Sequence, residues 1–299
     1  MSVAGLQDQL VRANNGYRAH FVEQLRKTEA EWMPLLSAIT MEIPSMGPSE
    51  EHNFGEAAPK MTEWVGDREI GRLGLDGFTL KNKNYANGVE IDRNDLEDDR
   101  LGLYVPQIRA MAEEGTLSKV DLLRDLLNGA FADLCYDGQA FFANAHPLSD
   151  SSSTNDNLIT GVLSNDNYRS ACTQLRELKD SRGRYLRMAA THLIVGNDNE
   201  WTAKEILNQE RLATGETNIA RGTAQLLVLP GLTSTNWIVA DLGKVLKPII
   251  FQNRRGIQFT EVEDASSPEV FMRRFYQYGA DWRGALGYAF YQCMVGSEG

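Results

Sequence analysis

The sequence predicts a mixed α+β fold with long projections, and three patterns in its 299 residues point to it. A leucine-rich stripe before residue 135 predicts a long amphipathic helix. Strand-like and helix-like segments alternate between 158 and 245, which is typical of a small α/β lobe. The N-terminal segment and residues 56–97 carry too little apolar surface to form a core of their own, so both must lie on another surface.

The first segment predicts an amphipathic helix, because apolar side chains recur mostly every three or four residues from Leu6 to Leu25. A long helix at a terminus needs a surface to pack against. Two alternatives stand: that surface belongs to a neighbouring subunit, or it belongs to the same chain. Residues 44–60 are rich in Pro, Gly and Glu and predict an extended linker.

The next segment, which runs to about residue 97, predicts a long two-stranded β-arm. Asp76-Gly77 and Asn87-Gly88 are dipeptides that favour hairpin turns. The arm is polar, and an isolated hairpin is only marginally stable in water. We therefore expect the arm to lie across another surface, which a second copy of the protein can provide.

The strongest helical pattern follows this arm. Ser118 can cap a helix whose apolar stripe runs from Leu122 to Leu134. A shorter helical run over 105–112 precedes it, and Gly115 is expected to separate the two. Asp137-Gly138 offers a glycine C-cap, so we expect the helix to end near Cys135.

Alternation of strands and helices begins after a polar loop over 149–157, for which we expect no buried residues. Helices are expected near 167–179 and 201–212, with strands at 191–196, 225–230 and 236–241. Together they predict a separate lobe over 158–245. The last part is β-rich, with strands at 247–252, 257–264 and 269–283 that Gly256 and Pro268 interrupt.

Composition argues against several classes of protein. The net charge of -11 disfavours non-specific binding to nucleic acid or to anionic membranes. No run of 18 apolar residues occurs, so we expect no membrane span. The 3 cysteines lie far apart and are odd in number, which predicts a reducing compartment and no disulfide framework.

One stretch, CYDGQAFFANAHP at 135–147, has residues typical of a catalytic site, because it holds Cys135, Asp137 and His146. Cys135 is expected at a helix C-terminus, where the negative end of the macrodipole disfavours a thiolate, and Asp137 adds negative charge. The favoured interpretation is a buried cysteine in a protein that is not an enzyme. A hydrolase that uses Cys135 and His146 stays as the weakest alternative.

Other chemical motifs are missing from the sequence. The 4 histidines have no metal-binding spacing, and no Walker A, GxGxxG or GxSxG motif occurs. We therefore expect no catalytic residue, no cofactor and no metal.

Five stretches resemble, in order, the major head subunits of phage Mu and its prophage relatives, which adopt the Hong Kong 97-like capsid fold. They are EWVGDREIGRLGLDGFTLKNKNYANGVEIDRNDLEDDRLGLYVPQI, LCYDGQAFFANAHP, LIVGNDNEWTAKEIL, KPIIFQNR and YGADWRGALGYAFYQ. The resemblance implies a major capsid protein that self-assembles into the icosahedral head of a tailed phage or prophage and encloses double-stranded DNA. It also implies assembly in the bacterial host cytoplasm and a final place in the virion.

The resemblance further implies how the chain is divided. Residues 1–55 are expected to form an N-terminal arm, 56–97 an extended loop built as a β-hairpin, 98–157 and 246–299 a peripheral domain with a long spine helix, and 158–245 an axial domain. The implied partners are further copies in pentamers and hexamers, a scaffold or protease, a portal, decoration proteins, and DNA bound without sequence specificity. An encapsulin-like compartment with protein cargo is the main alternative.

Contacts between subunits are expected from charged and aromatic side chains of the extended loop and of the β-rich end. The candidates are Trp64, Asp67, Arg68, Glu69, Arg72, Phe78, Lys81, Lys83, Tyr85, Arg254, Arg255, Arg273 and Arg274. Some Hong Kong 97-like shells form Lys–Asn cross-links, and Lys81, Asn82 and Lys83 lie in the corresponding loop. The resemblance does not extend to that chemistry, so we expect no cross-link.

Overall fold

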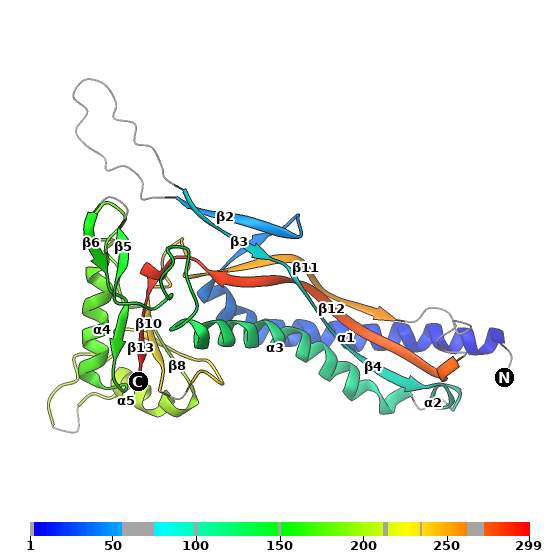
Figure 1. Cartoon of the computed structure of the whole chain (residues 1–299). Helices are drawn as coiled ribbons and strands as arrows, with labels where there is room; N and C mark the ends of the chain where they lie inside the picture. Colours follow the sequence, from blue (N-terminus) through cyan, green and yellow to red (C-terminus); the bar gives the residue numbers. More distant parts are fainter. Residues whose placement is uncertain are drawn as a thin grey trace, which may run out of the picture.

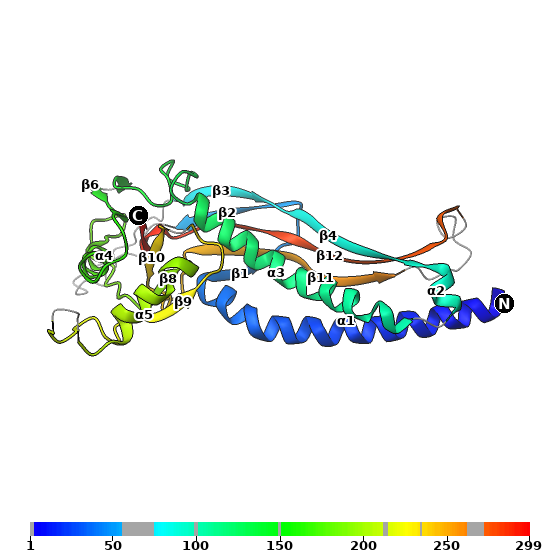
Figure 2. The same cartoon turned by 90° about the horizontal axis from the view of Figure 1, so that it is seen from below.

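Two sheets organise the chain, of which the computed structural model describes residues 3–55, 75–98, 101–148, 151–211, 215–233, 235–261 and 272–299. The larger is a long four-stranded sheet with the order β1-β11-β12-β4, formed by Thr40–Pro44, Ile249–Glu261, Phe275–Tyr288 and Lys83–Asp92. Helices α1 (Val3–Ile39) and α3 (Val105–Gly129) run along one face of this sheet (Figure 2). The result is an elongated part with a smaller lobe at one end (Figure 1).

Strand β12 shows why this sheet has one covered face. Its side chains alternate, and Tyr276, Tyr278 and Trp282 are buried against the helices. Gln277 and Asp281 point to the opposite, more exposed face, where they bond to Glu90 and Arg255. Such alternation is typical of an antiparallel sheet with one face in water.

Strand β11 is continuous where two strands were expected. It runs from Ile249 to Glu261, and its pairing with β12 shifts register between Asn253 and Gln258. Gly256 therefore lies in a bulge, which bends a strand without ending it.

Helix α3 is likewise continuous, so the prediction that Gly115 separates two helices is wrong. A Cβ at Gly115 would lie 3.3 Å from side-chain atoms of Ile257, and the glycine thus allows strand β11 to approach the helix closely. Ser118 lies inside the helix, where its hydroxyl accepts from Trp282 Nε1 at 3.0 Å. The helix ends at Gly129, and Cys135 follows in a turn.

Helix α1 packs on its own chain. Leu10, Tyr17 and Phe21 are buried together with Ile108 of α3 and Tyr278 of β12. Of the two alternatives for this helix, the structure supports the one in which the same chain provides the surface. The expectation that the N-terminal helix projects from the body for lack of a core is therefore wrong.

The lobe contains a five-stranded sheet with the order β7-β13-β10-β8-β9, from Leu158–Thr160, Met294–Glu298, Trp237–Ala240, His192–Val195 and Gln225–Val228. Helices α4 (Asn165–Glu177) and α5 (Glu200–Asn208) confirm the two expected there. Strand β13 comes from the C-terminal end of the chain, between β7 and β10. The sheet of the lobe thus extends beyond the expected range 158–245.

A shared core joins the lobe to the elongated part. It includes Leu127 of α3, Phe141 and Phe142 of the following loop, Ile238 of β10 and Phe251 of β11. Burial of aromatic and aliphatic side chains at one such junction resists relative motion of the two parts. Short elements complete the structure: α2 (Arg93–Glu97), β5 (His146–Leu148), β6 (Ser151–Asn155), and the 3₁₀ turns Leu101–Leu103, Asn197–Asn199 and Tyr291–Cys293.

The hairpin at the side of the sheet differs from the expected one. Strand β2 (Ser49–Gly55) pairs antiparallel with β3 (Leu75–Lys81), so part of the expected linker is a strand. Asp76-Gly77 lies within β3, and Asn87-Gly88 lies within β4, where Gly88 faces Gly279 of β12. Neither dipeptide forms the predicted turn, because each is paired with a neighbouring strand. Residues 56–74 lie outside the described part of the chain.

The first prediction tests the packing of α1. Phe21→Ala should lower the free energy of unfolding of the unassembled subunit by about 3–5 kcal/mol, because the ring is only 1% exposed. Val22→Ala, next to it on the outer face, is the control and should change it by about 0.5 kcal/mol or less. Urea unfolding measures both values. Equal effects would show that α1 does not dock within the single subunit.

Candidate inter-subunit surfaces

The base of the β2–β3 hairpin is held to the large sheet by a buried side chain, Gln252 of β11, which is 0% exposed. Its amide nitrogen donates to Asn82 Oδ1 at 2.7 Å and to Leu80 O at 3.3 Å. Its amide oxygen lies 2.7 Å from His52 Nε2, which must therefore be the donor. One side chain thus bonds to β2, to β3 and to the residue that links β3 to β4.

Asn82 extends this network to the turn between β1 and β2. Its amide nitrogen donates to Ser45 Oγ at 2.8 Å and to Gly47 O at 2.9 Å. Glu50 Oε1 accepts from Gly47 N, Met46 N and Ser45 Oγ at 2.7, 2.7 and 2.9 Å. The bond from Gly47 N–H, followed by those from Ser45 and Met46, lowers the pKa of Glu50, so its carboxylate is ionised at neutral pH. The network sets the direction in which the hairpin leaves the sheet.

The structure places only some of the predicted contact residues. Trp64, Asp67, Arg68, Glu69 and Arg72 lie outside the described residues. Lys81 and Lys83 are exposed on either side of the buried Asn82, whose amide is already bonded within the network.

Two predicted contact residues face their own chain. Tyr85 stacks on Trp282 with ring centroids 4.4 Å apart. Phe78 is half-buried, and its ring centroid lies 5.9 Å from that of His52. These contacts make both residues part of the fold, and their predicted role between subunits stays a prediction.

The four predicted arginines are exposed and fall into two groups. Arg254 Nη1 donates to Ser45 O at 2.9 Å, and Arg255 pairs with Asp281 on the open face of the sheet. Arg273 and Arg274 lie at the far end of β12 from the lobe (Figure 1). Arg274 has a φ of 58°, which is uncommon for a residue with a side chain, and its carbonyl accepts from Arg93 N at 2.9 Å.

Sequence reasoning missed another set of surface residues, which are large, apolar and exposed. Met46, Trp201, Ile219 and Val245 are 87%, 72%, 68% and 90% exposed. Trp201 had a detectable signal, because it lies outside the apolar stripe of α5 formed by Ala203, Ile206 and Leu207. The others lie in turns or loops, where hydrophobic periodicity gives no information.

The 135–147 stretch forms a buried joint. Asn157 Nδ2 faces three carbonyl oxygens, of Phe141, Met294 and Tyr291, at 2.9, 3.3 and 3.4 Å. Asn157 Oδ1 must therefore be the atom that accepts from Ala143 N at 2.9 Å and from His146 Nε2 at 3.1 Å. His146 is 0% exposed, and its Nδ1 lies 2.5 Å from Asp137 Oδ2. The joint ties the loop after α3 to β5 and to β13.

Cysteine catalysis has no support in this geometry. Both ring nitrogens of His146 are engaged by Asp137 and Asn157, and Cys135 Sγ is directed at Ala289 O, 3.9 Å away. Burial raises the pKa of Cys135 to about 12, so the thiol is protonated at neutral pH. The hydrolase alternative therefore lacks an activated nucleophile. The polar loop after it also differs from expectation, because Asn155 and Asn157 are buried.

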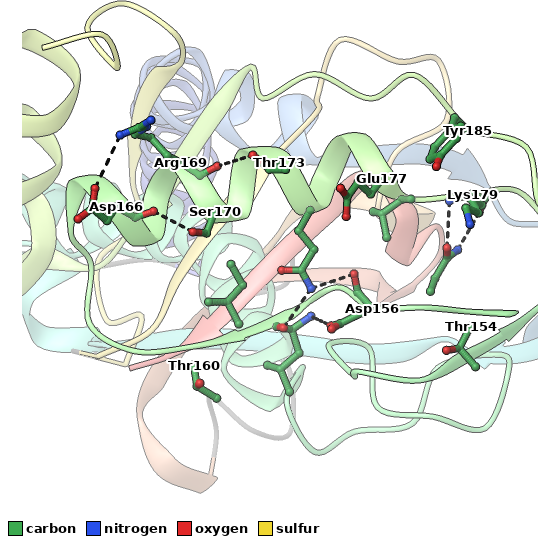
Figure 3. Close-up of a pocket in the computed structure, with 15 residues that line it drawn as sticks. Thr154, Asp156, Thr160, Asp166, Arg169, Ser170, Thr173, Glu177, Lys179 and Tyr185 are labelled. Carbon is green, nitrogen blue, oxygen red and sulfur yellow. Dashed lines mark hydrogen bonds and ion pairs between the residues drawn. The ribbon is translucent and has the colours of Figure 1, made fainter.

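A polar groove of about 1070 Å³ lies beside α4 and the edge strand β7 (Figure 3). Gln174 of α4 donates to Asp156 O at 3.1 Å and to Leu158 O at 3.2 Å, and so covers part of that edge. Covering an edge strand limits its pairing with other chains.

Within the described residues, no group of three or more His, Cys, Asp or Glu is placed to hold a metal ion, and no helix is long and apolar enough to span a membrane.

The second prediction concerns the hairpin base. Gln252→Leu should leave His52, Leu80 and Asn82 with unpaired polar groups and cost about 1–3 kcal/mol of stability. Amide hydrogen exchange in 78–82 should accelerate. Gln258→Leu, at an exposed position of the same strand, is the control. Unchanged exchange in the Gln252 variant would mean that the network does not hold the hairpin.

The third prediction concerns the thiols. Burial raises the pKa of Cys135 and of Cys293 to about 12, so at pH 8 only about 10⁻⁴ of each is thiolate, and this fraction rises tenfold per pH unit. Iodoacetamide should therefore label both residues at least a hundredfold more slowly in the folded subunit than in urea, as measured by mass spectrometry. Equal rates for Cys135 in the two states would contradict this. Cys135→Ala should leave assembly unchanged.

Comparison with known proteins identifies the family. The sequence model of the Mu-like prophage major head subunit gpT family matches residues 10–161, 159–232 and 230–299. The Mu-like prophage FluMu major head subunit of Haemophilus influenzae is 25% identical over 95% of this chain and 71% of its own length. The major capsid protein of Escherichia phage Mu is 26% identical over 87% of this chain and 65% of its own length. The chain thus spans about two thirds of the length of that second relative.

Solved structures show the same fold. The procapsid of bacteriophage JBD30 matches 96% of this chain and 73% of its own, with a TM-score of 0.61 at 23% identity. The elongated sheet and the lobe are therefore arranged as in phage capsid proteins. With the family model matching the chain almost from end to end, this chain belongs to the Mu-like prophage major head subunit family.

Proposed function

We propose that copies of this chain close into the icosahedral head of a tailed phage or prophage, around packaged double-stranded DNA. As a major head subunit, the chain works in the capsid of the virion. The observation that carries the proposal is the fold of phage capsid proteins: an elongated sheet, to which Gln252 hydrogen-bonds the β2–β3 hairpin, with a lobe at one end (Figure 1).

The parts of the chain correspond to those of a Hong Kong 97-like subunit in this proposal. Residues 1–55 act as the N-terminal arm and 56–97 as the extended loop. Strand β3 of the loop pairs with β2 of the arm, and β4 joins the loop to the large sheet. Residues 98–157 and 246–299 form the peripheral domain, with α3 as its spine helix. Residues 158–245 form the axial domain, to which β13 adds a strand. The sharing of β13 supports a subunit that moves as one piece.

Contacts between neighbours are heterologous in this proposal, so that one kind of surface meets a different one and rotation closes the ring. Arg273 and Arg274 are exposed at the far end of the sheet from the lobe and are suited to pair with acidic groups of a neighbour. One exposed ion pair contributes only about 0–1 kcal/mol. Such pairs matter here through their repetition in every subunit of the shell.

The net negative charge of the chain is also compatible with a shell that encloses DNA and later releases it. Since the whole chain carries a net charge of -11, we expect an inner wall that repels DNA on average and leaves it mobile enough to exit the head. A strongly positive lumen in an assembled shell would contradict this.

Further proposed partners are a scaffold or protease, a portal and decoration proteins. The last are supported by a JBD30 capsid of the same fold that is decorated with minor capsid protein trimers.

The fourth prediction tests the function itself. Purified protein should form closed shells or rings that sediment far faster than the 33.4 kDa subunit and are visible by negative-stain electron microscopy. After boiling in SDS, the chain should run at 33.4 kDa, because no covalent cross-link is expected. A ladder of larger bands would contradict the absence of cross-links. A solitary subunit under native assembly conditions, with the other head proteins present, would overturn the proposed function.

A further inference from the structure

Trp201 is an exposed aromatic residue on the lobe that the fold does not use. It is 72% exposed on α5, while Ala203, Ile206 and Leu207 bury the other side of that helix. Asp198 and Glu205 are exposed three residues before it and four residues after it. Lys204 lies 4.4 Å from the centroid of its ring, and Glu200 neutralises that lysine at 2.5 Å. We refer to Asp198, Trp201 and Glu205 as the α5 surface, which is aromatic and acidic.

A second exposed apolar site has the opposite charge. Val245 is 90% exposed and Leu246 48% exposed in the loop between β10 and β11. Lys244 precedes Val245, and its Nζ donates to the carbonyl of Arg187 at 3.3 Å. The Arg187 side chain is exposed, and its φ of 55° is rare for a residue other than glycine. We refer to Arg187, Lys244, Val245 and Leu246 as the Val245 surface.

Electrostatics within the subunit leaves the Val245 surface positive. Lys244 forms an ion pair with Asp241, whose Oδ2 lies 3.9 Å from Lys244 Nζ. Asp241 is buried and already accepts from Ala189 N at 2.9 Å and Gly243 N at 3.1 Å. Asp241 therefore offsets part of the charge of Lys244, and the two cations Arg187 and Lys244 still outnumber it on this surface.

The two surfaces lie at opposite ends of the sheet of the lobe. Strands β8 and β10 are antiparallel, with Val195 opposite Trp237 and His192 opposite Ala240. The α5 surface follows the end of β8 at Val195, and the loop with Val245 follows the end of β10 at Ala240. Figure 1 shows α5 at one end of these strands. A copy can therefore present one surface to one neighbour and the second surface to another.

We infer that the α5 surface of one copy binds the Val245 surface of the next, so that the lobes form a ring. This inference rests on the proposed function and specifies its contact. Trp201 covers Val245 and Leu246 of the neighbour, while Glu205 and Asp198 pair with Arg187 and Lys244. Tryptophan and arginine are among the residue types that are enriched at the strongest contact positions of protein interfaces. Because the two surfaces differ and are of opposite charge, the contact is head-to-tail, as a closed ring requires.

The test is a charge exchange in the full-length chain. Arg187→Glu and Glu205→Arg should each lower the equilibrium constant for assembly at least about tenfold, or about 1.4 kcal/mol per contact. The chain with both substitutions should recover to within about threefold of the unsubstituted protein, because the pair is restored with reversed sign. Trp201→Ser should also weaken assembly, without a change in the unfolding of the subunit. Light scattering and electron microscopy measure the assembled fraction against concentration.

Arg26→Glu provides the matched control, since it makes the same change of charge at an exposed position of α1. Circular dichroism and urea unfolding of each variant show whether the subunit is still folded. If either single variant assembles as the unsubstituted protein does, or if the double variant does not recover, the inference is wrong while the proposed function stands. If the unsubstituted protein forms no shell or ring, the proposed function fails, and the inference fails with it.

Discussion

The pairing of the two long strands β11 and β12 is the constraint on which the rest of the structure depends. One face of this pair receives α1 and α3, through Tyr278 and Trp282 among others. Its lobe end enters the core that also holds Phe142 and Ile238, and its side carries the hairpin through Gln252. The elongated part, the lobe and the hairpin therefore take their relative positions from one ladder of backbone hydrogen bonds.

Local patterns predicted those elements whose stability is mainly local. The helix capped by Ser164, whose hydroxyl accepts from Asn167 N, appears as expected, and so do three of the five strands of the lobe sheet, β8, β9 and β10. Local patterns gave wrong predictions where contacts with a segment distant in the sequence determine the structure. Gly115 would weaken an isolated helix, but close packing against Ile257 retains it. Asn87-Gly88 favours a turn, but pairing with β12 holds it in a strand.

How far each candidate surface could be predicted also depends on whether its contacts are local or come from distant segments. Exposed charges such as Arg273 can be recognised in a sequence, because charged side chains are rarely buried without a partner. The hairpin base could not be predicted, since Gln252 bonds to residues 170 and 200 positions away. No local pattern marks a buried glutamine whose partners come from other segments. Trp201 could be recognised in part, because its position outside the apolar stripe of α5 indicates that its side chain is exposed.

A buried polar network is a weak source of stability, yet a shell has a specific use for one. A typical hydrogen bond contributes a net of only about 1 kcal/mol, so apolar groups at Gln252 and Asn82 could hold the hairpin as firmly. Apolar contacts are not directional, however, and would allow the hairpin to tilt. The hydrogen bonds that join Gln252, Asn82 and His52 weaken steeply when their angles change, so together they favour one direction of the hairpin. A closed shell repeats one contact geometry many times, so small errors in direction accumulate around each ring. Directional bonds at the base of the hairpin are therefore worth retaining even where they add little to the stability of a single subunit.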